Sequence, residues 1–283
     1  MQFKAGQLRR VAGASVPVFR HVGHNPGPMT GPGTNTYFLG AERRCVVDPG
    51  PADAQQVESL LRCVEGPLDV ILVTHTHRDH SPAARLLQEA TGAQLVGASV
   101  PDAIAQDATF VPDIEVQHGQ VLELQDFSIE CIATPGHVSN HFCYLVREEQ
   151  GLLTGDHVLQ GTTPVILPPD GDMQAYLASL AELLTRPLAF LAPGHGDIMR
   201  QPHAEIRQLI AHRQRRENKI IEALRKSGPA SIDAVVLMAY DDVAEHLLPW
   251  AAKTLLAHLI KLEREGRALV RDENWELLTH EGN

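Results

Sequence analysis

Three histidines and one aspartate fall within residues 75–80, in the stretch THTHRDH that follows the apolar run VILV. Removing so many polar side chains from water is costly unless another group compensates them. Three later stretches repeat this arrangement, with an apolar run leading to a Gly-containing turn: ATPGHV, LLTGDH and LAPGHG. If these were unrelated turn residues, the same arrangement would have had to arise independently in four places. The clusters therefore indicate one shared centre at the edge of a sheet.

The side chains of these clusters are typical metal ligands. Imidazole nitrogen and carboxylate oxygen suit Zn²⁺, with Mn²⁺ or Fe²⁺ as alternatives. Seven ligands are too many for one tetrahedral ion, but they match two ions about 3.5–4 Å apart that share a carboxylate and a hydroxide. We therefore expect two divalent metal ions, with zinc preferred. The candidate ligands are His75, His77, Asp79, His80, His137, Asp156 and His195.

The order of the motifs resembles the metallo-β-lactamase superfamily. HxHxDH at 75–80 is followed by Gly-His at 136–137, Gly-Asp at 155–156 and Pro-Gly-His-Gly at 193–196, and an early aspartate lies in CVVDPG. The resemblance covers roughly residues 15–200. It implies that Asp156 bridges the two metals and that Asp48 orients ligands without binding metal. It also divides the other ligands between a first metal (His75, His77, His137) and a second metal (Asp79, His80, His195).

Two further features resemble the lactamase-beta-2-like family within this superfamily. They are the segment NPGPMTGPGTNTYFLG at 25–40 and the helical tail of the chain. That family includes a mitochondrial endoribonuclease acting on single-stranded RNA and fungal proteins that hydrolyse acyl-carrier thioesters. The resemblance therefore implies a hydrolase and leaves two substrate classes open.

The pattern of elements predicts two domains. Strand-like and helix-like segments up to residue 202 favour a layered α/β domain, and the resemblance makes it a four-layer αββα sandwich. Helical patterns then begin at 202, 231 and 250, and a hairpin is expected to turn near 272–274. This is the order of a winged helix. We therefore predict a metallo-β-lactamase domain at 1–202 and a small winged-helix domain at 203–283.

The charge and composition of the sequence argue against some classes of binding partner. The net charge is −11 with histidine neutral, and the residues from 202 onward carry 12 Lys plus Arg against 13 Asp plus Glu. We therefore expect no binding of double-stranded DNA, which needs a basic face. The sequence shows no apolar run near 18 residues, no signal peptide and no paired cysteines, so we expect a cytoplasmic protein with no membrane partner. A homodimer remains open.

The expected reaction is hydrolysis by a metal-bridging hydroxide, with Asp79 orienting or deprotonating it. Phosphodiester cleavage of single-stranded RNA is the first hypothesis, on the strength of the family resemblance. Hydrolysis of a thioester or another small ester is the alternative, and a non-catalytic, metal-bearing regulator is the third. The intact ligand set speaks against the regulator.

Two sets of residues could contact the substrate. Thr34 and Asn35 precede the strand-like region at 36–47 and form one set. Thr162 and Thr163 follow Asp156 and form the other. Each set could equally form a turn. The stretch HRQRRENK at 212–219 is the notable basic patch. It is either a clamp for an RNA backbone or a solvated helix face.

Overall fold

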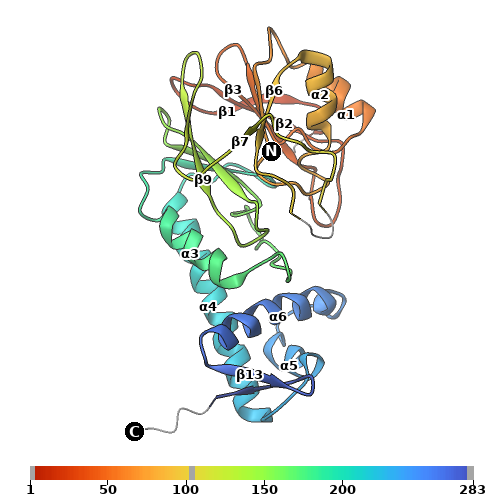
Figure 1. Ribbon diagram of the computed structural model, residues 1–283, viewed down its shortest axis with the longest axis vertical. Coiled ribbons are helices and arrows are strands. Elements are labelled where there is room, and N and C mark those ends of the chain that lie inside the picture. The colour runs from red at the N-terminus through yellow and green to blue at the C-terminus, as the bar shows by residue number, and fades with distance from the viewer. Residues whose placement is uncertain (1–3, 102–105, 279–283) are drawn as a thin grey trace. The chain divides into compact units, whose positions relative to one another are not determined.

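The computed structural model describes residues 4–101 and 106–278 (Figure 1). The chain divides into two compact units. The first contains residues up to 135, 140–164 and 185–205, and the second contains 136–139, 165–184 and the residues from 206 onward. Two segments of the predicted first domain, 136–139 and 165–184, thus group with the second unit.

Seven strands form the first sheet among the described residues, in the order in which they occur in the chain. The first four strands pair antiparallel, whereas β4, β5, β6 and β7 pair parallel. Each parallel pair needs a crossover connection, and two helices form the crossovers from β4 to β5 and from β5 to β6. The strands are β1 (Leu8–Ala12), β2 (Val18–Val22), β3 (Asn35–Leu39), β4 (Cys45–Val47), β5 (Val70–Leu72), β6 (Gln94–Gly97) and β7 (Ile114–Glu115), and the helices are α1 (Ala54–Leu61) and α2 (Ala83–Thr91).

The second sheet contains five strands of the described chain in the order β12-β11-β10-β9-β8. Its pairs are antiparallel except β11 with β12. Buried side chains of both sheets, such as Leu72 and Tyr144, form one apolar core between them. The strands are β8 (Val121–Glu123), β9 (Ser128–Ala133), β10 (Phe142–Val146), β11 (Gly151–Gly155) and β12 (Phe190–Pro193).

Helices α1 and α2 cover the other face of the first sheet (Figure 1). Leu60 and Leu87 of these helices pack with Ile71 in a second apolar cluster. Asp53 caps α1 by accepting a hydrogen bond from the Gln56 amide, and Gly92 ends α2 in the left-handed conformation. The first unit therefore contributes three of the four predicted layers, and the remaining candidate helix, α3, groups with the second unit.

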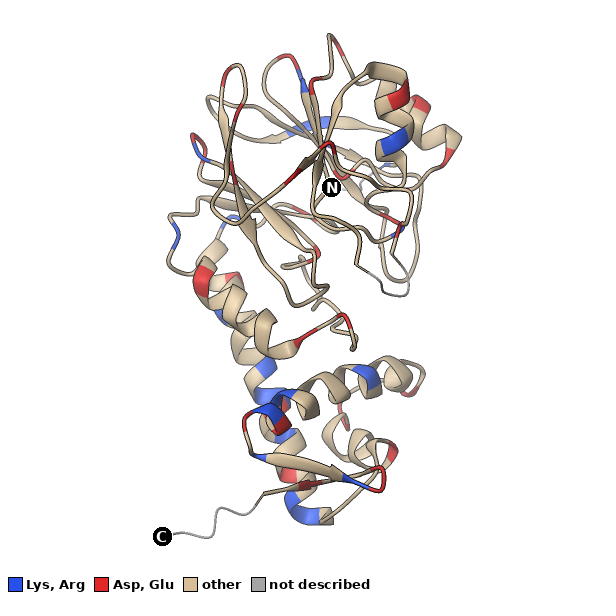
Figure 2. Ribbon diagram, viewed as in Figure 1, with Lys and Arg blue, Asp and Glu red and all other residues tan. Residues whose placement is uncertain are grey.

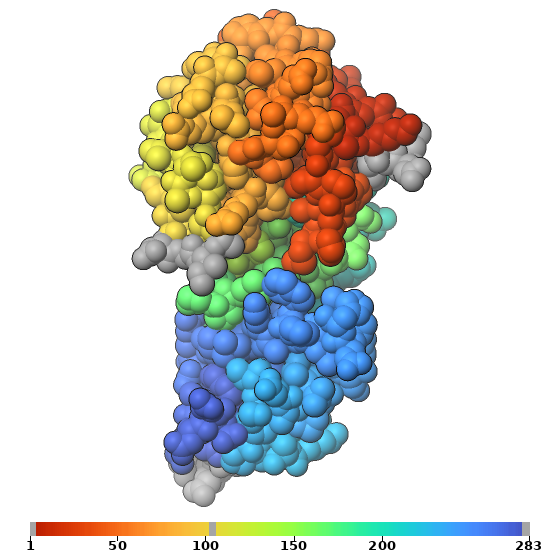
Figure 3. Space-filling model, turned by 90° about the vertical axis from the view of Figure 1, so that its right-hand side faces the viewer, coloured from red at the N-terminus to blue at the C-terminus, as the bar shows by residue number. Residues whose placement is uncertain are grey.

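The second unit contains the predicted helices and hairpin (Figure 1). Figure 3 shows the surface of its described residues from 206 onward in shades of blue. Ile220, Leu255, Leu259 and Trp275 belong to its apolar core. Residues 272 and 273 both have positive φ at the hairpin turn, the backbone that a tight two-residue turn requires. The elements are α3 (Met173–Leu183), α4 (Pro202–Ser227), α5 (Ile232–Ala239), the 3₁₀ helix η1 (Glu245–Leu247), α6 (Leu248–Arg264), β13 (Ala268–Arg271) and β14 (Asn274–Leu277).

No helix within the described ranges has both the length and the apolar character needed to cross a membrane. The four cysteines are buried, and no disulfide joins described residues. Burial raises the pKa of Cys45 and, to about 12, that of Cys131, so these thiols remain protonated and pack as small apolar groups.

Candidate metal centre

Ends of strands from both sheets bring the predicted ligands of the first unit together. The HxHxDH loop follows β5 of the first sheet, whereas Asp156 and His195 follow β11 and β12 of the second. Ligand atoms of His75, His80 and Asp156 lie within 4.8 Å of one another, and so do those of Asp79, His80 and His195. His80 thus belongs to both groups.

The distances between these atoms fit a metal ion. His80 Nε2 lies 3.4 Å from both Asp79 Oδ2 and Asp156 Oδ1. His195 Nε2 lies 3.2 Å from Asp79 Oδ2 and 3.4 Å from Asp156 Oδ1. Two ligand atoms that are each about 2.0–2.1 Å from a tetrahedral zinc ion are about 3.4 Å apart. His80 Nε2 is buried and faces both carboxylates, which is the position expected of a metal ligand atom.

His75 and His77 lie beside this cluster. His75 Nε2 is 3.1 Å from His77 Nδ1, and the two rings meet edge to face with centroids 4.7 Å apart. The His75 ring also stacks on His141 at 5.0 Å. Burial and the neighbouring His80 lower the pKa of His75 well below its usual value. His75 is therefore a neutral imidazole, the form that binds metal.

His137 lies in the segment 136–139 of the second unit. Its Nδ1 donates a hydrogen bond to the carbonyl oxygen of Val165 at 2.7 Å. This bond fixes the tautomer in which the proton is on Nδ1 and Nε2 is the acceptor nitrogen. Gly136 is required beside it, because a Cβ there would lie 2.4 Å from the Cα of Tyr176. The role of His137 as a ligand remains a prediction.

The side chain of Asp48 holds the histidine loop through hydrogen bonds. Asp48 has a positive φ of 51°, and its side chain is buried. Oδ2 lies 2.9 Å from His80 Nδ1 and accepts a 2.7 Å hydrogen bond from Thr74 Oγ1, while Oδ1 accepts one from the Thr74 amide. The bond to Nδ1 directs His80 Nε2 at Asp79 and Asp156. This is the carboxylate–histidine arrangement found behind metal ligands.

Thr74 is a further residue of the centre that the sequence alone did not reveal. Its Oγ1 donates a hydrogen bond to Asp48 and lies 3.0 Å from His75 Nδ1. One hydroxyl therefore connects His75 to the carboxylate that holds His80. Its position directly before His75 was the available signal, but the partner of its hydroxyl depends on the turn at Asp48. The sequence does not specify that turn.

Two glycines leave room at the centre of the cluster. A Cβ on Gly194 would lie 2.7 Å from both Asp156 Oδ1 and His80 Cε1. A Cβ on Gly155 would lie 2.4 Å from Thr74 Oγ1. A side chain at either position would therefore clash with these atoms. The Gly-Asp and Gly-His motifs therefore let two backbone segments approach the ligands.

The carboxylates and imidazoles of the cluster shift each other's pKa values. Burial lowers the pKa of His195, but the charge of Asp156 and hydrogen bonds to Asp156 and Asp79 outweigh burial and raise it to about 9. Burial and the carboxylates act on His80 in the same way, with a pKa well above the usual value as the result. The two histidines in turn lower the pKa values of Asp79 and Asp156 despite their burial. Metal binding replaces the protons of these imidazoles.

Two of the predicted substrate contacts are buried and hydrogen-bonded within the protein, and their contact with substrate remains a prediction. Thr34 and Asn35 are buried at 0% and 2% exposure. Asn35 Nδ2 donates hydrogen bonds to the carbonyl oxygens of Pro193 and Gly196, and Thr34 Oγ1 lies 3.5 Å from Asp79 Oδ2. Both therefore position the ligand loops. Thr162 is exposed and Thr163 half-buried, and their role remains a prediction.

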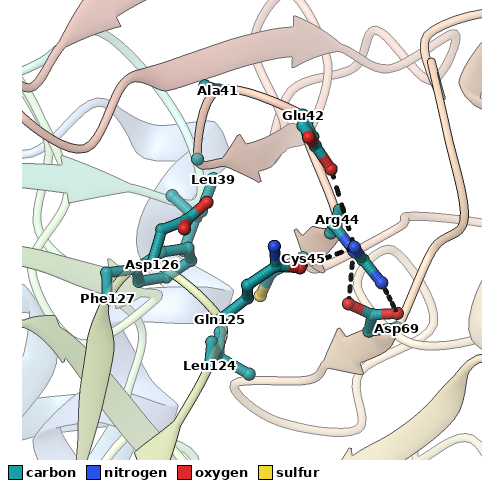
Figure 4. A pocket seen from close by; sticks show the side chains of 11 residues that line it. Leu39, Ala41, Glu42, Arg44, Cys45, Asp69, Leu124, Gln125, Asp126 and Phe127 are labelled. Atoms are coloured by element: carbon teal, nitrogen blue, oxygen red, sulfur yellow. Dashed lines mark hydrogen bonds and ion pairs between the residues drawn. The ribbon is translucent and has the colours of Figure 1, made fainter.

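A small cavity in the first unit is unrelated to this cluster (Figure 4). It lies beside Arg44, whose guanidinium pairs with both oxygens of Asp69 at 2.6 and 2.7 Å. The cavity volume is about 20 Å³, which is enough for about one water molecule. It cannot hold a substrate.

Comparison with known proteins decides the family. Residues 29–195 match the family model described as the metallo-beta-lactamase superfamily, and residues 231–275 match the beta-lactamase associated winged helix domain. The chain belongs to the metallo-β-lactamase superfamily. Its members are generally metal-dependent hydrolases, so the predictions of a hydrolase and of an α/β fold with a C-terminal winged helix are confirmed.

Relatives within the superfamily match most of the chain. A beta-lactamase-like protein 2 homolog from Drosophila melanogaster is 31% identical over 270 residues, which cover 89% of this chain and 90% of the relative. An atrochrysone carboxyl ACP thioesterase from Aspergillus fumigatus is 33% identical over 217 residues, covering 74% of this chain and 65% of the relative. A solved Burkholderia ambifaria beta-lactamase domain protein is 20% identical, with a TM-score of 0.79 over 98% of this chain and 95% of its own.

Proposed function

We propose that this metallo-β-lactamase superfamily member hydrolyses acyl thioesters with two divalent metal ions. The observation that carries the choice of substrate is the similarity to a thioesterase, 33% identical over 217 residues. The expected metal ligands are those predicted from the sequence, with His75, His77 and His137 at one ion and Asp79, His80 and His195 at the other. Asp156 would bridge the two ions.

The charges of α4 speak against the competing RNA hypothesis. Arg213 and Arg216 of the basic stretch are buried. The guanidinium of Arg213 lies over the ring of Tyr176, and that of Arg216 pairs with Asp242. Lys219 pairs with Asp241 and Asp242. Both acidic and basic residues occur along the helix (Figure 2), and Arg215 of the basic stretch is exposed. Cations that already pair with protein groups are less available to neutralise a phosphate backbone.

The side chains divide the work of the reaction. Two divalent ions, when bound, supply an activated water and stabilise the negative charge that develops on the carbonyl oxygen. Asp79 is 30% exposed, against 0% for His80 and 8% for His195, so its carboxylate can meet an incoming substrate. The histidines around it lower its pKa despite burial and keep it ionised, so it can orient a water molecule by accepting a hydrogen bond. Asp48 and Thr74 hold the imidazoles in place.

Parallel assays test the proposal. The purified protein, loaded with zinc or manganese, is given an acyl-CoA series, single-stranded RNA and bis-p-nitrophenyl phosphate. We expect hydrolysis of the thioesters, and a loss of about 100-fold or more in kcat for Asp79→Asn, because that substitution removes the negative charge that orients the water. Cleavage of RNA with no thioester hydrolysis would overturn the proposal and restore the first hypothesis.

A further inference from the structure

The second unit contains a cavity of about 370 Å³ that the proposed chemistry does not use. This volume lies within the range of small-molecule sites, about 300–1,000 Å³. Most of the lining is apolar and comes from the loop before α3 and from one face of α6. The lining residues are Pro168, Pro169, Gly171, Asp172, Met173, Leu256, Ala257, Ile260 and Arg264.

The wall of this cavity is hydrogen-bonded to the loop that carries His137. The amide of Asp172 donates to the carbonyl oxygen of Gly136 at 2.8 Å. The amide of Ser139 donates to Asp170 Oδ1 at 3.0 Å. Both bonds lie within the second unit. A molecule in the cavity is therefore beside a loop that is predicted to hold metal.

The charges at the cavity compensate each other. Arg264 and Asp172 form an ion pair, and Asp172 also caps α3 by accepting a 2.9 Å hydrogen bond from the amide of Ala175. Arg264 is the cation of the lining and is already paired. The cavity therefore has no free positive charge for a phosphate, whereas Leu256, Ile260 and Met173 offer apolar surface. An uncharged apolar group suits this lining best.

We propose that this cavity binds the apolar acyl group of the thioester substrate. The inference rests on the proposed function and adds the substrate class, namely acyl chains of medium length or aromatic acyl groups. Each buried methylene strengthens binding by about fourfold. An eight-carbon acyl group should therefore be a much better substrate than acetyl.

Filling the cavity tests this assignment. Ala257 is buried at 2% exposure and lines the cavity, so Ala257→Phe places a ring in the space. The matched control is Ala90→Phe, at an exposed position of α2. For the full-length, metal-loaded protein, we expect Ala257→Phe to lower kcat/KM for octanoyl-CoA about tenfold more than for acetyl-CoA. The control should leave kcat/KM unchanged for both substrates. Equal losses on both substrates, with unchanged metal content and circular dichroism, would overturn the proposal.

A second variant and a binding measurement keep the test independent of folding and of catalysis. Ile260→Ala enlarges the cavity and should shift the preference toward longer chains. Calorimetric binding of octanamide to the wild type should weaken about tenfold or more in Ala257→Phe. If the wild type binds octanamide in this manner but hydrolyses no thioester, the proposed function fails and the cavity assignment stands. Thioester hydrolysis that does not depend on chain length would refute the cavity assignment alone.

Discussion

Asp48 illustrates how a residue outside the ligand set can control the centre. Its carboxylate accepts two hydrogen bonds from Thr74 and contacts His80 Nδ1. Asp48→Asn removes the charge but keeps the shape, and Asn tolerates positive φ, so the backbone is not strained. We expect metal affinity to fall about 10- to 100-fold, as titration with a competing chelator would measure. Unchanged affinity would show that Asp48 only shapes the turn.

Gly194 gives a steric test at the same scale. Gly194→Ala would place a methyl group 2.7 Å from both Asp156 Oδ1 and His80 Cε1. We expect the variant to fold but to lose bound metal, measured by elemental analysis. Gly66→Ala is the matched control, because a Cβ at Gly66 has no atom within 4 Å. Full metal content in Gly194→Ala would contradict the position assigned to the ions.

Spacing in the sequence was sufficient to find the ligand cluster but not its supports. Residues 75–80 supply four candidate metal ligands in one loop, so their type alone predicts a site. The roles of Thr34 and Asn35 were not predictable, because Asn35 bonds the carbonyls of residues 193 and 196, which are distant in the sequence. Burial of such residues is decided by tertiary packing.

At the scale of elements, Glu217 of α4 joins α6 and the residues before β13. It lies 2.9 Å from Lys261 Nζ, 3.4 Å from His258 Nδ1 and 3.2 Å from Arg267. Burial raises the pKa of Glu217, but the hydrogen bonds from His258 and Lys261 outweigh burial and lower it to about 2. A lowered pKa stabilises the folded state above the unfolded value of about 4.3. This stabilisation is lost as the pH falls toward 2.

Glu217→Gln tests this network. We expect it to reduce the free energy of unfolding at pH 7 by about 1–2 kcal/mol, with an allowance for partial screening by water. The reduction should become small near pH 2, where about half of the Glu217 side chains are protonated in the folded wild type. The control Glu222→Gln, also on α4, removes a solvent-exposed pair and should cost less than about 0.5 kcal/mol. Urea unfolding at several pH values measures both, and a loss that does not depend on pH would exclude the ionic contribution.

Helix and hairpin order in the second unit was predictable because each element is local. Helical spacing and the Pro202 and Gly228 boundaries predicted α4, which the structure places at Pro202–Ser227. The grouping of 165–184 with this unit was not predictable, since tertiary contacts decide it. The basic stretch on α4 was predicted to be solvated or RNA-binding, but two of its three arginines, Arg213 and Arg216, are buried and contact Tyr176 and Asp242.

At the scale of the whole molecule, the order of the metal motifs predicted the superfamily, and its match over 29–195 confirms it. The substrate was not predictable in this way, because metal ligands are shared among members that act on different bonds. A net charge of −11 and paired cations on α4 favour an uncharged or weakly charged substrate group over a nucleic acid.

Elemental analysis of the full-length protein, reconstituted with zinc and freed of excess ions, tests the two-metal centre most directly. We predict about two ions per chain in the wild type and a marked loss in His80→Ala and Asp156→Ala, while the cavity variant Ala257→Phe keeps both. A wild type that retains no stoichiometric metal, or ligand variants that retain as much as the wild type, would contradict the two-metal centre.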